Sequence, residues 1–470
     1  MTTSQVTTRP AATETGPAER TEPGPPAPKP EPYRRPRLGR RLRGPRRLSV
    51  RAAVAIILLA ALCATAVIGS VTVRADTSRL HATVSERAAV AAKLRYSLAD
   101  LDAQRADTLA PGMSAAETGV YVGDQLNALI TAQQRRTEVS GLLQQLSGDR
   151  AHSGLVVGIL NGLARYDDLS GRADYVDGQS PDRLAGHPSK VTVSMNVQAG
   201  EIMNDALLPA ASALSAAYQR QADADAASVH DIAARWLLAV GVLGLVTLFF
   251  LLWWQRELAR DYRRLVSLPL SAATAAVLAV GLAGVVALSS CSSAVASANR
   301  DGLRPWSRLA EAKAVAAQAA AAESRWFVHG TALGTADQAQ FTSRIKQLDK
   351  LLTPTGYATA AERPAYQDVL TRYGHFRADD ARLRKLKASG DTDAAAAVLT
   401  EVARGDVAFD FWDFATTLDA LAEQQLDAFT AHADDARGAL GGWPGVPAGA
   451  LGVAGALVLL AVRPRLAEYR

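Results

Sequence analysis

The sequence predicts an all-α integral membrane protein with four transmembrane helices and two extracytoplasmic antiparallel helical bundles. Four apolar stretches without Asp, Glu, Lys or Arg are each long enough to cross a hydrocarbon layer as a helix. Between them lie two regions of roughly 150 residues whose apolar residues recur at helical spacing. The distribution of charge then predicts which parts of the chain face the cytoplasm.

These observations divide the 470 residues into nine segments. The N-terminal segment is rich in Thr, Pro and Arg, which is typical of a disordered tail rather than of a packed core. The predicted organisation is a disordered basic Pro-rich cytoplasmic tail 1–51, transmembrane helix 52–73, bundle 74–235, transmembrane helix 236–254, cytoplasmic loop 255–264, transmembrane helix 265–290, bundle 291–442, transmembrane helix 443–462 and cytoplasmic tail 463–470.

Charge predicts the orientation, because short cytoplasmic segments of membrane proteins collect Lys and Arg. The tail 1–51 carries a net charge of +8, and the loop 255–264 and the tail 463–470 carry +2 each. The long regions are acidic by comparison, at −5 for residues 75–235 and −3 for residues 292–442. We therefore expect a multi-pass plasma-membrane protein with both termini inside. Its basic tail would contact anionic lipids, and nothing indicates a nucleic-acid partner.

The second outer region repeats the plan of the first. Near its end, the helical spacing of Phe411, Phe414, Leu418 and Leu421 predicts one buried face. Phe409 and Trp412 project elsewhere, so they are candidates for contact with a partner or ligand.

Helix breakers predict where the bundles join the spans. The entry to the second span has neither Gly nor Pro, which predicts a rigid connection from the first bundle. Breaks are expected at 299–305 and 438–447, on either side of the second bundle, and a loop is expected at 171–190.

The sequence gives no positive sign of an enzyme. It contains no metalloprotease helix, paired CxxC, nucleophile elbow or phosphate-binding loop, and its seven histidines are scattered without metal-ligand spacing. The spans carry no ionisable residue that would bind an ion or relay a proton, which argues against a transporter. We expect no catalytic residue, no metal and no cofactor.

Two further features bear on function. Cys291 ends a Leu-Ser-Ser-Cys sequence similar to a lipoprotein processing box, which would make it a lipidation site; an uncleaved span with a chance cysteine is the favoured alternative.

The predicted cytoplasmic loop 255–264 places four charged residues at spacings of three and four, where a helical turn would present them to a cytosolic partner. The alternative is that the arginines only fix topology. The four residues are Glu257, Arg260, Asp261 and Arg264.

Two resemblances accompany these patterns. Residues 323–327, 341–352, 391–399 and 411–421 together resemble the four-helix-bundle sensory domains of bacterial chemoreceptors, although no HAMP, methyl-accepting or kinase domain follows. The whole architecture resembles the actinobacterial four-span membrane protein that links an extracytoplasmic glutamine- and aspartate-binding lipoprotein to the soluble Ser/Thr protein kinase G. That resemblance implies a solute-binding lipoprotein and a cytosolic kinase as partners.

The function expected from these features is sensing. The chain would couple an extracytoplasmic solute, or a solute-binding protein, to a cytosolic Ser/Thr kinase, either as a monomer or as a homo-oligomer. The alternative is a structural or envelope-assembly scaffold that sends no signal inward.

Overall fold

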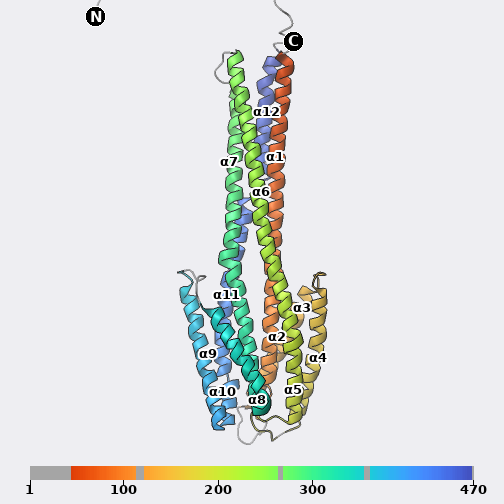
Figure 1. Ribbon diagram of the computed structural model, residues 1–470, viewed down its shortest axis with the longest axis vertical. Coiled ribbons are helices and arrows are strands. Elements are labelled where there is room, and N and C mark those ends of the chain that lie inside the picture. Colours follow the sequence, from red (N-terminus) through yellow and green to blue (C-terminus); the bar gives the residue numbers. More distant parts are fainter. Residues whose placement is uncertain (1–43, 113–120, 181, 263–267, 354–359, 468–470) are drawn as a thin grey trace, which may run out of the picture.

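The computed structural model describes residues 44–112, 121–180, 182–262, 268–353 and 360–467, which are almost entirely helical and contain no strand. Figure 1 shows a long stalk of helices that widens at one end into a head. The stalk helices are α1 (Gly44–Ala82), α6 (Leu208–Tyr262), α7 (Leu268–Ser297) and α12 (Gly445–Ala467). Helices α1 and α6 contain the predicted spans 52–73 and 236–254, and α7 and α12 cover most of the spans 265–290 and 443–462.

The prediction of four membrane-spanning helices is confirmed in its coarse form. Each stalk helix includes an uncharged or nearly uncharged window long and apolar enough to cross a membrane. Large apolar side chains cover the outside of the stalk, where lipid rather than water is their favourable environment. Ile57, Leu238, Phe249, Leu282 and Leu459 are examples, all of them more than half exposed.

The residues buried between the stalk helices recur at a regular spacing along the sequence. Buried residues of α1 recur at steps of three and four, the spacing of a coiled-coil seam. Small and large side chains mix in this seam, so the four helices approach closely along their length. The seam residues of α1 are Leu48, Ala52, Ala55, Leu59, Leu62 and Ala66.

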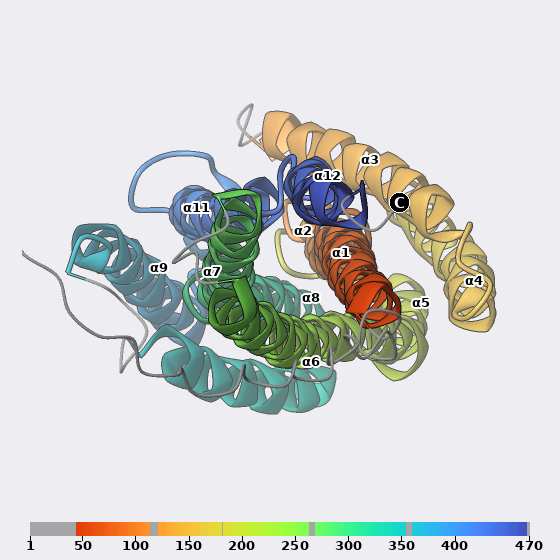
Figure 2. The same cartoon turned by 90° about the horizontal axis from the view of Figure 1, so that it is seen from above.

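The head consists of two halves of similar plan. The first half contains α2 (Ala89–Asp107), α3 (Tyr121–Leu146), α4 (Ser153–Asp177), α5 (Lys190–Ile202) and the start of α6. The second half contains α8 (Arg304–Leu352), α9 (Arg363–Ser389), α10 (Thr392–Thr400) and α11 (Val407–Ala439). Figures 1 and 2 place α3 and α4 at one edge of the head and α9 at the opposite edge.

The two halves share one hydrophobic core instead of forming separate bundles. Buried residues from α2, α3 and α4 and from α8, α9 and α11 belong to a single connected cluster. The packing of α2 against α8 joins the halves, and α2 also packs on α3 and α6. The two predicted outer regions therefore meet at the α2/α8 contact, and the prediction of two antiparallel bundles stays a prediction.

Within the described ranges, three segments of π-helix join consecutive α-helices. Segment η2 (Thr83–Ala88) joins α1 to α2, η4 (Ala298–Leu303) joins α7 to α8, and η3 (Met203–Leu207) joins α5 to α6. The sequence led us to expect a break at 299–305, and this prediction is wrong. Gly302 there stays helical, and its missing side chain lets the backbone of Phe429 approach to 2.6 Å from the position that a Cβ would occupy.

Helix α8 changes direction at Gly330, whose φ of 70° lies in the region that favours glycine. The change of direction separates a first arm, residues 304–329, from a second arm, residues 331–352. The carbonyl groups before it lose their helical partners. Lys387 of α9 replaces these partners, because its Nζ donates to the carbonyl oxygens of Trp326 at 3.0 Å and Phe327 at 2.7 Å.

Other boundaries differ from expectation by one turn or more. Helix α4 continues through the start of the expected 171–190 loop and ends at Asp177. Residues 401–406 separate α10 from α11. The break predicted before the last span is confirmed, since α11 ends at Ala439 and α12 begins at Gly445.

Candidate functional site

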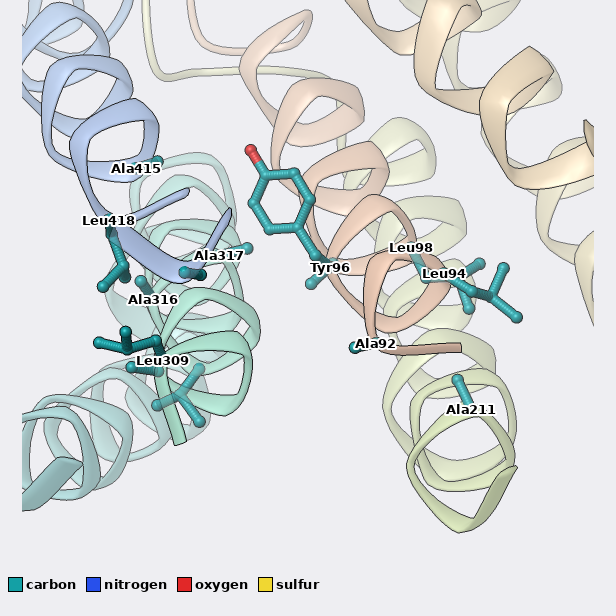
Figure 3. Packing of buried hydrophobic residues seen from close by; sticks show 14 of the residues in the cluster. Ala92, Leu94, Tyr96, Leu98, Ala211, Leu309, Ala316, Ala317, Ala415 and Leu418 are labelled. Atoms are coloured by element: carbon teal, nitrogen blue, oxygen red, sulfur yellow. The ribbon is translucent and has the colours of Figure 1, made fainter. Parts of the chain in front are cut away.

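The contact between α2 and α8 is built from small side chains. The first arm of α8 carries a run of alanines, and α2 contributes several more, so the two backbones approach with little side-chain volume between them. In Figure 3, Tyr96 projects from α2 toward the α8 and α11 side. The buried alanines of α2 and of the first arm of α8 include Ala91, Ala99, Ala103, Ala312, Ala316, Ala319 and Ala320.

A buried ion pair crosses this contact between the halves. Arg325 of α8 donates from Nη1 to the carboxylate of Asp102 on α2, and from Nε to Asp337 Oδ1 at 3.0 Å. Its Nη2 donates to Gln340 Oε1 at 2.9 Å. Tyr166 of α4 adds a hydrogen bond to Asp102 Oδ1 at 3.1 Å. Because Arg325 and Asp102 are almost fully buried, the charges depend on each other rather than on water.

His329 extends the network to a third element of the first half. Its Nδ1 lies 2.7 Å from Asp337 Oδ2, and its Nε2 lies 2.8 Å from Asn196 Oδ1 on α5. Gln340 also reaches across, donating to Asn204 Oδ1 of η3 at 2.8 Å. The clasp, which we define as Arg325, His329, Asp337 and Gln340 with their partners on α2, α4, α5 and η3, thus links three helices and a π segment of one half to α8.

A cavity of about 160 Å³ lies between the two halves, and its lining includes Glu323 and Ser324, which directly precede Arg325 in α8. Residues of α2 and α3 form one wall, and residues of α8, α10 and α11 form the other. We call it the interhalf pocket. Its polar lining residues include Asp100, Asp107, Arg135, Glu323 and Thr400, and its aromatic ones are Tyr96, Phe411 and Trp412.

The charged groups of the interhalf pocket are not balanced. Arg135 is held by Asp100 at 2.5 Å and by Glu138 at 2.8 Å. Glu323 is fully buried, and neither of its carboxylate oxygens receives a hydrogen bond. Burial, together with the nearby Asp380 carboxyl, raises the pKa of Glu323 well above its usual range. Burial likewise raises the pKa of Asp107 to about 7.

The two predicted aromatic contacts lie at this end of α11. Trp412 lines the interhalf pocket and is 57% exposed. Phe409 is half-buried, with its ring centroid 5.8 Å from that of Trp412 and Arg404 over its other side. Phe411, Phe414, Leu418 and Leu421 are all buried, as their spacing predicted.

The predicted inner-loop residues lie at the opposite end of the molecule. Glu257 is half-buried and forms an ion pair of 2.8 Å with Arg51 of α1, so its carboxylate already has a cationic partner within the stalk. Arg260 is exposed near the end of α6. Asp261 is helical and also lies in α6, while Arg264 falls outside the described residues. Three of the four residues therefore lie in the last turns of α6, and the prediction for all four as one surface stays a prediction.

Cys291 lies within α7, which continues without interruption on both sides of it. Its side chain is fully buried, in a region where α7 faces α1 and α11. In this position the residue acts as a small apolar side chain in a helix contact. Among the described residues, no group of three or more His, Cys, Asp or Glu is arranged to hold a metal ion.

The clasp and Glu323 were not predicted as site residues from the sequence. Glu323 and Arg325 lie in the stretch that resembles chemoreceptor sensory domains, but they looked like ordinary helical surface charges. One signal in the sequence could have indicated that they are buried. Both lie just after a run of alanines, and a helix face made of such small residues is readily covered by another helix, which would also cover the charges.

The fold and the site together define a class: a multi-pass helical membrane protein with a two-half head and a polar site between the halves. No family model, characterised protein or solved structure was found to be similar to the chain.

Proposed function

We propose that the protein is a four-span plasma-membrane sensor with its head outside the cytoplasm and both termini inside. The basic flanks at the free end of the stalk and the acidic balance of the head support this orientation. The head would detect a solute or a solute-loaded binding protein, and the stalk would pass the change to a cytosolic partner. The resemblance in architecture favours a binding lipoprotein outside and a Ser/Thr kinase inside.

One observation carries the proposal. The two helices that meet between the halves, α2 and α8, each continue through a π segment into a stalk helix, α1 and α7 respectively. A ligand or partner that changes the α2/α8 contact therefore acts directly on two helices that enter the membrane. Continuous helices transmit such small displacements as rigid elements.

The inner end offers a partner mainly basic groups. Since Arg51 holds Glu257, the exposed side chains of this region include Arg256 and Arg260. An acidic or mixed-charge surface would be attracted to them. We propose that this end, together with the basic tail, recruits the cytosolic partner.

Orientation is tested with topology reporters placed at exposed turns. Gly390, with a φ of 84°, and Gly148, which has open space around it, lie between helices in the second and first halves. An extracytoplasmic reporter inserted at either turn should be active, and one fused after Arg470 should be inactive. Activity of a cytosolic reporter at Gly390 would contradict the proposal. Gly186 is unsuitable, because it is packed against Phe327 and Thr392 of the other half.

Signalling is tested by photo-crosslinking from position 260 in living cells, followed by mass spectrometry. A sensor should yield a cytosolic kinase or its adaptor, and deletion of the protein should change phosphorylation of that kinase's targets. A scaffold would instead yield only envelope proteins and leave the phosphorylation pattern unchanged. The second result would replace sensing with envelope assembly.

A further inference from the structure

The interhalf pocket has the size of a small-molecule site. Its volume is about 160 Å³, similar to engineered cavities of about 150 Å³ that bind benzene. Both halves contribute to its lining, so a bound molecule would contact α2 and α8 at once. Ligand sites commonly occupy such positions between packed units.

The polar end of the pocket is lined mainly by acidic residues. Among the charged residues that line it, Arg135 is the cation, and Asp100 and Glu138 already bind its guanidinium. Glu323 has no hydrogen-bond donor on either oxygen, and Asp107 has none on Oδ1. Arg384 attracts the Glu323 carboxylate, but Asp380 already binds Arg384 at 2.5 Å, and the negative charge of Asp380 opposes ionisation of Glu323. An isolated buried carboxylate is strongly unfavourable unless a positive group or a proton joins it.

The remaining lining is apolar and aromatic. Phe411, Trp412, Leu399, Val402 and Val407 form much of the second-half wall. Tyr96 already faces Lys313, whose Nζ lies 4.2 Å from the ring centroid. Within the described part of the chain no cation lies over Trp412. This residue is exposed at the pocket with the Phe409 ring 5.8 Å away, so part of its indole is accessible to a ligand.

We propose that the interhalf pocket binds a small organic cation, a protonated amine with an apolar or aromatic body. The ammonium group would lie between Glu323 of α8 and Asp107 of α2, and the body would pack on Trp412. By joining two carboxyl groups from different halves, the ligand would tighten the α2/α8 contact. The inference rests on the proposed sensing function for its biological meaning, whereas the binding itself depends only on the head.

The test uses the full-length protein in nanodiscs and three probes of equal size. These are 2-phenylethylamine, which is cationic, 2-phenylethanol, which is neutral, and phenylacetate, which is anionic. Isothermal titration calorimetry near pH 7.5, with empty nanodiscs subtracted, should show saturable binding of the amine alone. The purified protein needs no cytosolic partner, so a failure of binding is distinguishable from a failure of signalling.

Three variants assign the binding to the pocket. Glu323→Gln keeps the shape of the side chain and should weaken amine binding at least about tenfold, the effect of losing a charge-assisted hydrogen bond. Trp412→Ala removes an exposed ring and should weaken binding severalfold with the core intact. Glu423→Gln, at an exposed position on α11, should bind like the wild type.

Two results would overturn the proposal. One is equal binding of the amine and the alcohol, which would mean nonspecific uptake of the ring. The other is unchanged amine affinity in Glu323→Gln. If Glu323→Gln does not fold, as judged by its circular dichroism, the affinity of Trp412→Ala decides the matter.

Discussion

Two buried ionisable residues at the α2/α8 contact are understood only with their surroundings. Arg325 has carboxylate partners from both halves, whereas Glu323, two residues earlier on the same helix, receives no hydrogen bond and lies near the Asp380 carboxyl. The ion pairs of Arg325 hold α2 and α8 together. The buried carboxyl of Glu323 is instead stabilised by a proton or by a cationic ligand.

The clasp predicts a large effect from one substitution. Arg325→Ala should destabilise the head by about 3–5 kcal/mol, because it leaves Asp102 and Asp337 buried without a cation. Thermal or denaturant unfolding followed by circular dichroism measures this. The matched control is Arg382→Ala, at an exposed position 3.7 Å from Asp406, which should cost no more than about 1 kcal/mol. Similar losses in both variants would contradict the role of the clasp.

Asp107 predicts a pH dependence with a definite sign. Its folded-state pKa, about 7, lies above the usual range of an Asp carboxyl because burial disfavours the charged form. The stability that this group contributes is therefore complete below about pH 4 and is lost as the pH rises to about 7, at no more than roughly 1.4 kcal/mol per pH unit.

Asp107→Asn, which stays neutral, removes this contribution. Relative to the wild type, the variant should become progressively more stable as the pH increases from 4 to 7. The measurement is the unfolding midpoint of both proteins across that range. Parallel profiles would show that Asp107 titrates normally in the folded head.

At the scale of whole elements, the connections between head and stalk are unequal. Helix α6 crosses from head to stalk unbroken, and α1 and α7 do so through π segments. The connection from α11 to α12 passes through residues 440–444, where Gly442 has a φ of 72°. Three connections are therefore suited to transmit a displacement, and the fourth is suited to absorb one.

This inequality predicts different responses to inserted glycines. Two glycines after Ala234 in α6, or after Val295 in α7, should uncouple head from stalk, because glycine inside a helix costs about 1 kcal/mol per residue and adds flexibility. The same insertion after Gly442 should be tolerated. Phosphoproteomics of cells carrying each variant measures the outcome, with the first two expected to match a deletion strain.

Membrane abundance of the three variants, measured by immunoblot, is the control for misfolding. Equal signalling by all three at equal abundance would show that helix continuity does not carry the signal.

For the molecule as a whole, the shared core means that neither half is complete alone. A fragment of residues 76–233 would expose the face of α2 that packs on α8 and would leave Asp102 without Arg325. We expect this fragment to be helical but self-associating, with a broad unfolding transition. Mixing it with a fragment of residues 298–439 should give a stable one-to-one complex.

Size-exclusion chromatography with light scattering and circular dichroism would detect these states. A monomeric 76–233 fragment with sharp, cooperative unfolding would show that the first half folds independently.

The sequence by itself determined the helical class, the four spans, the buried face from Phe411 to Leu421 and the break before the last span. These depend on local rules: the length of an uncharged stretch, the spacing of apolar residues along a helix, and the effect of Gly and Pro on the backbone. It misjudged Gly302 as a breaker, because the close approach of Phe429 that makes glycine necessary there involves a residue more than a hundred positions away.

The tertiary structure alone decided that the halves share one core and that Asp102, Arg325 and Asn196 belong to one network. Helical periodicity shows which face of a helix is apolar. An alanine-rich face with an occasional charge, however, is equally compatible with a buried and with a solvent-exposed position. Whether such a charge is buried and paired depends on the other helix that covers it. For this protein, the α2/α8 contact is what turns surface-like charges into a clasp and a pocket.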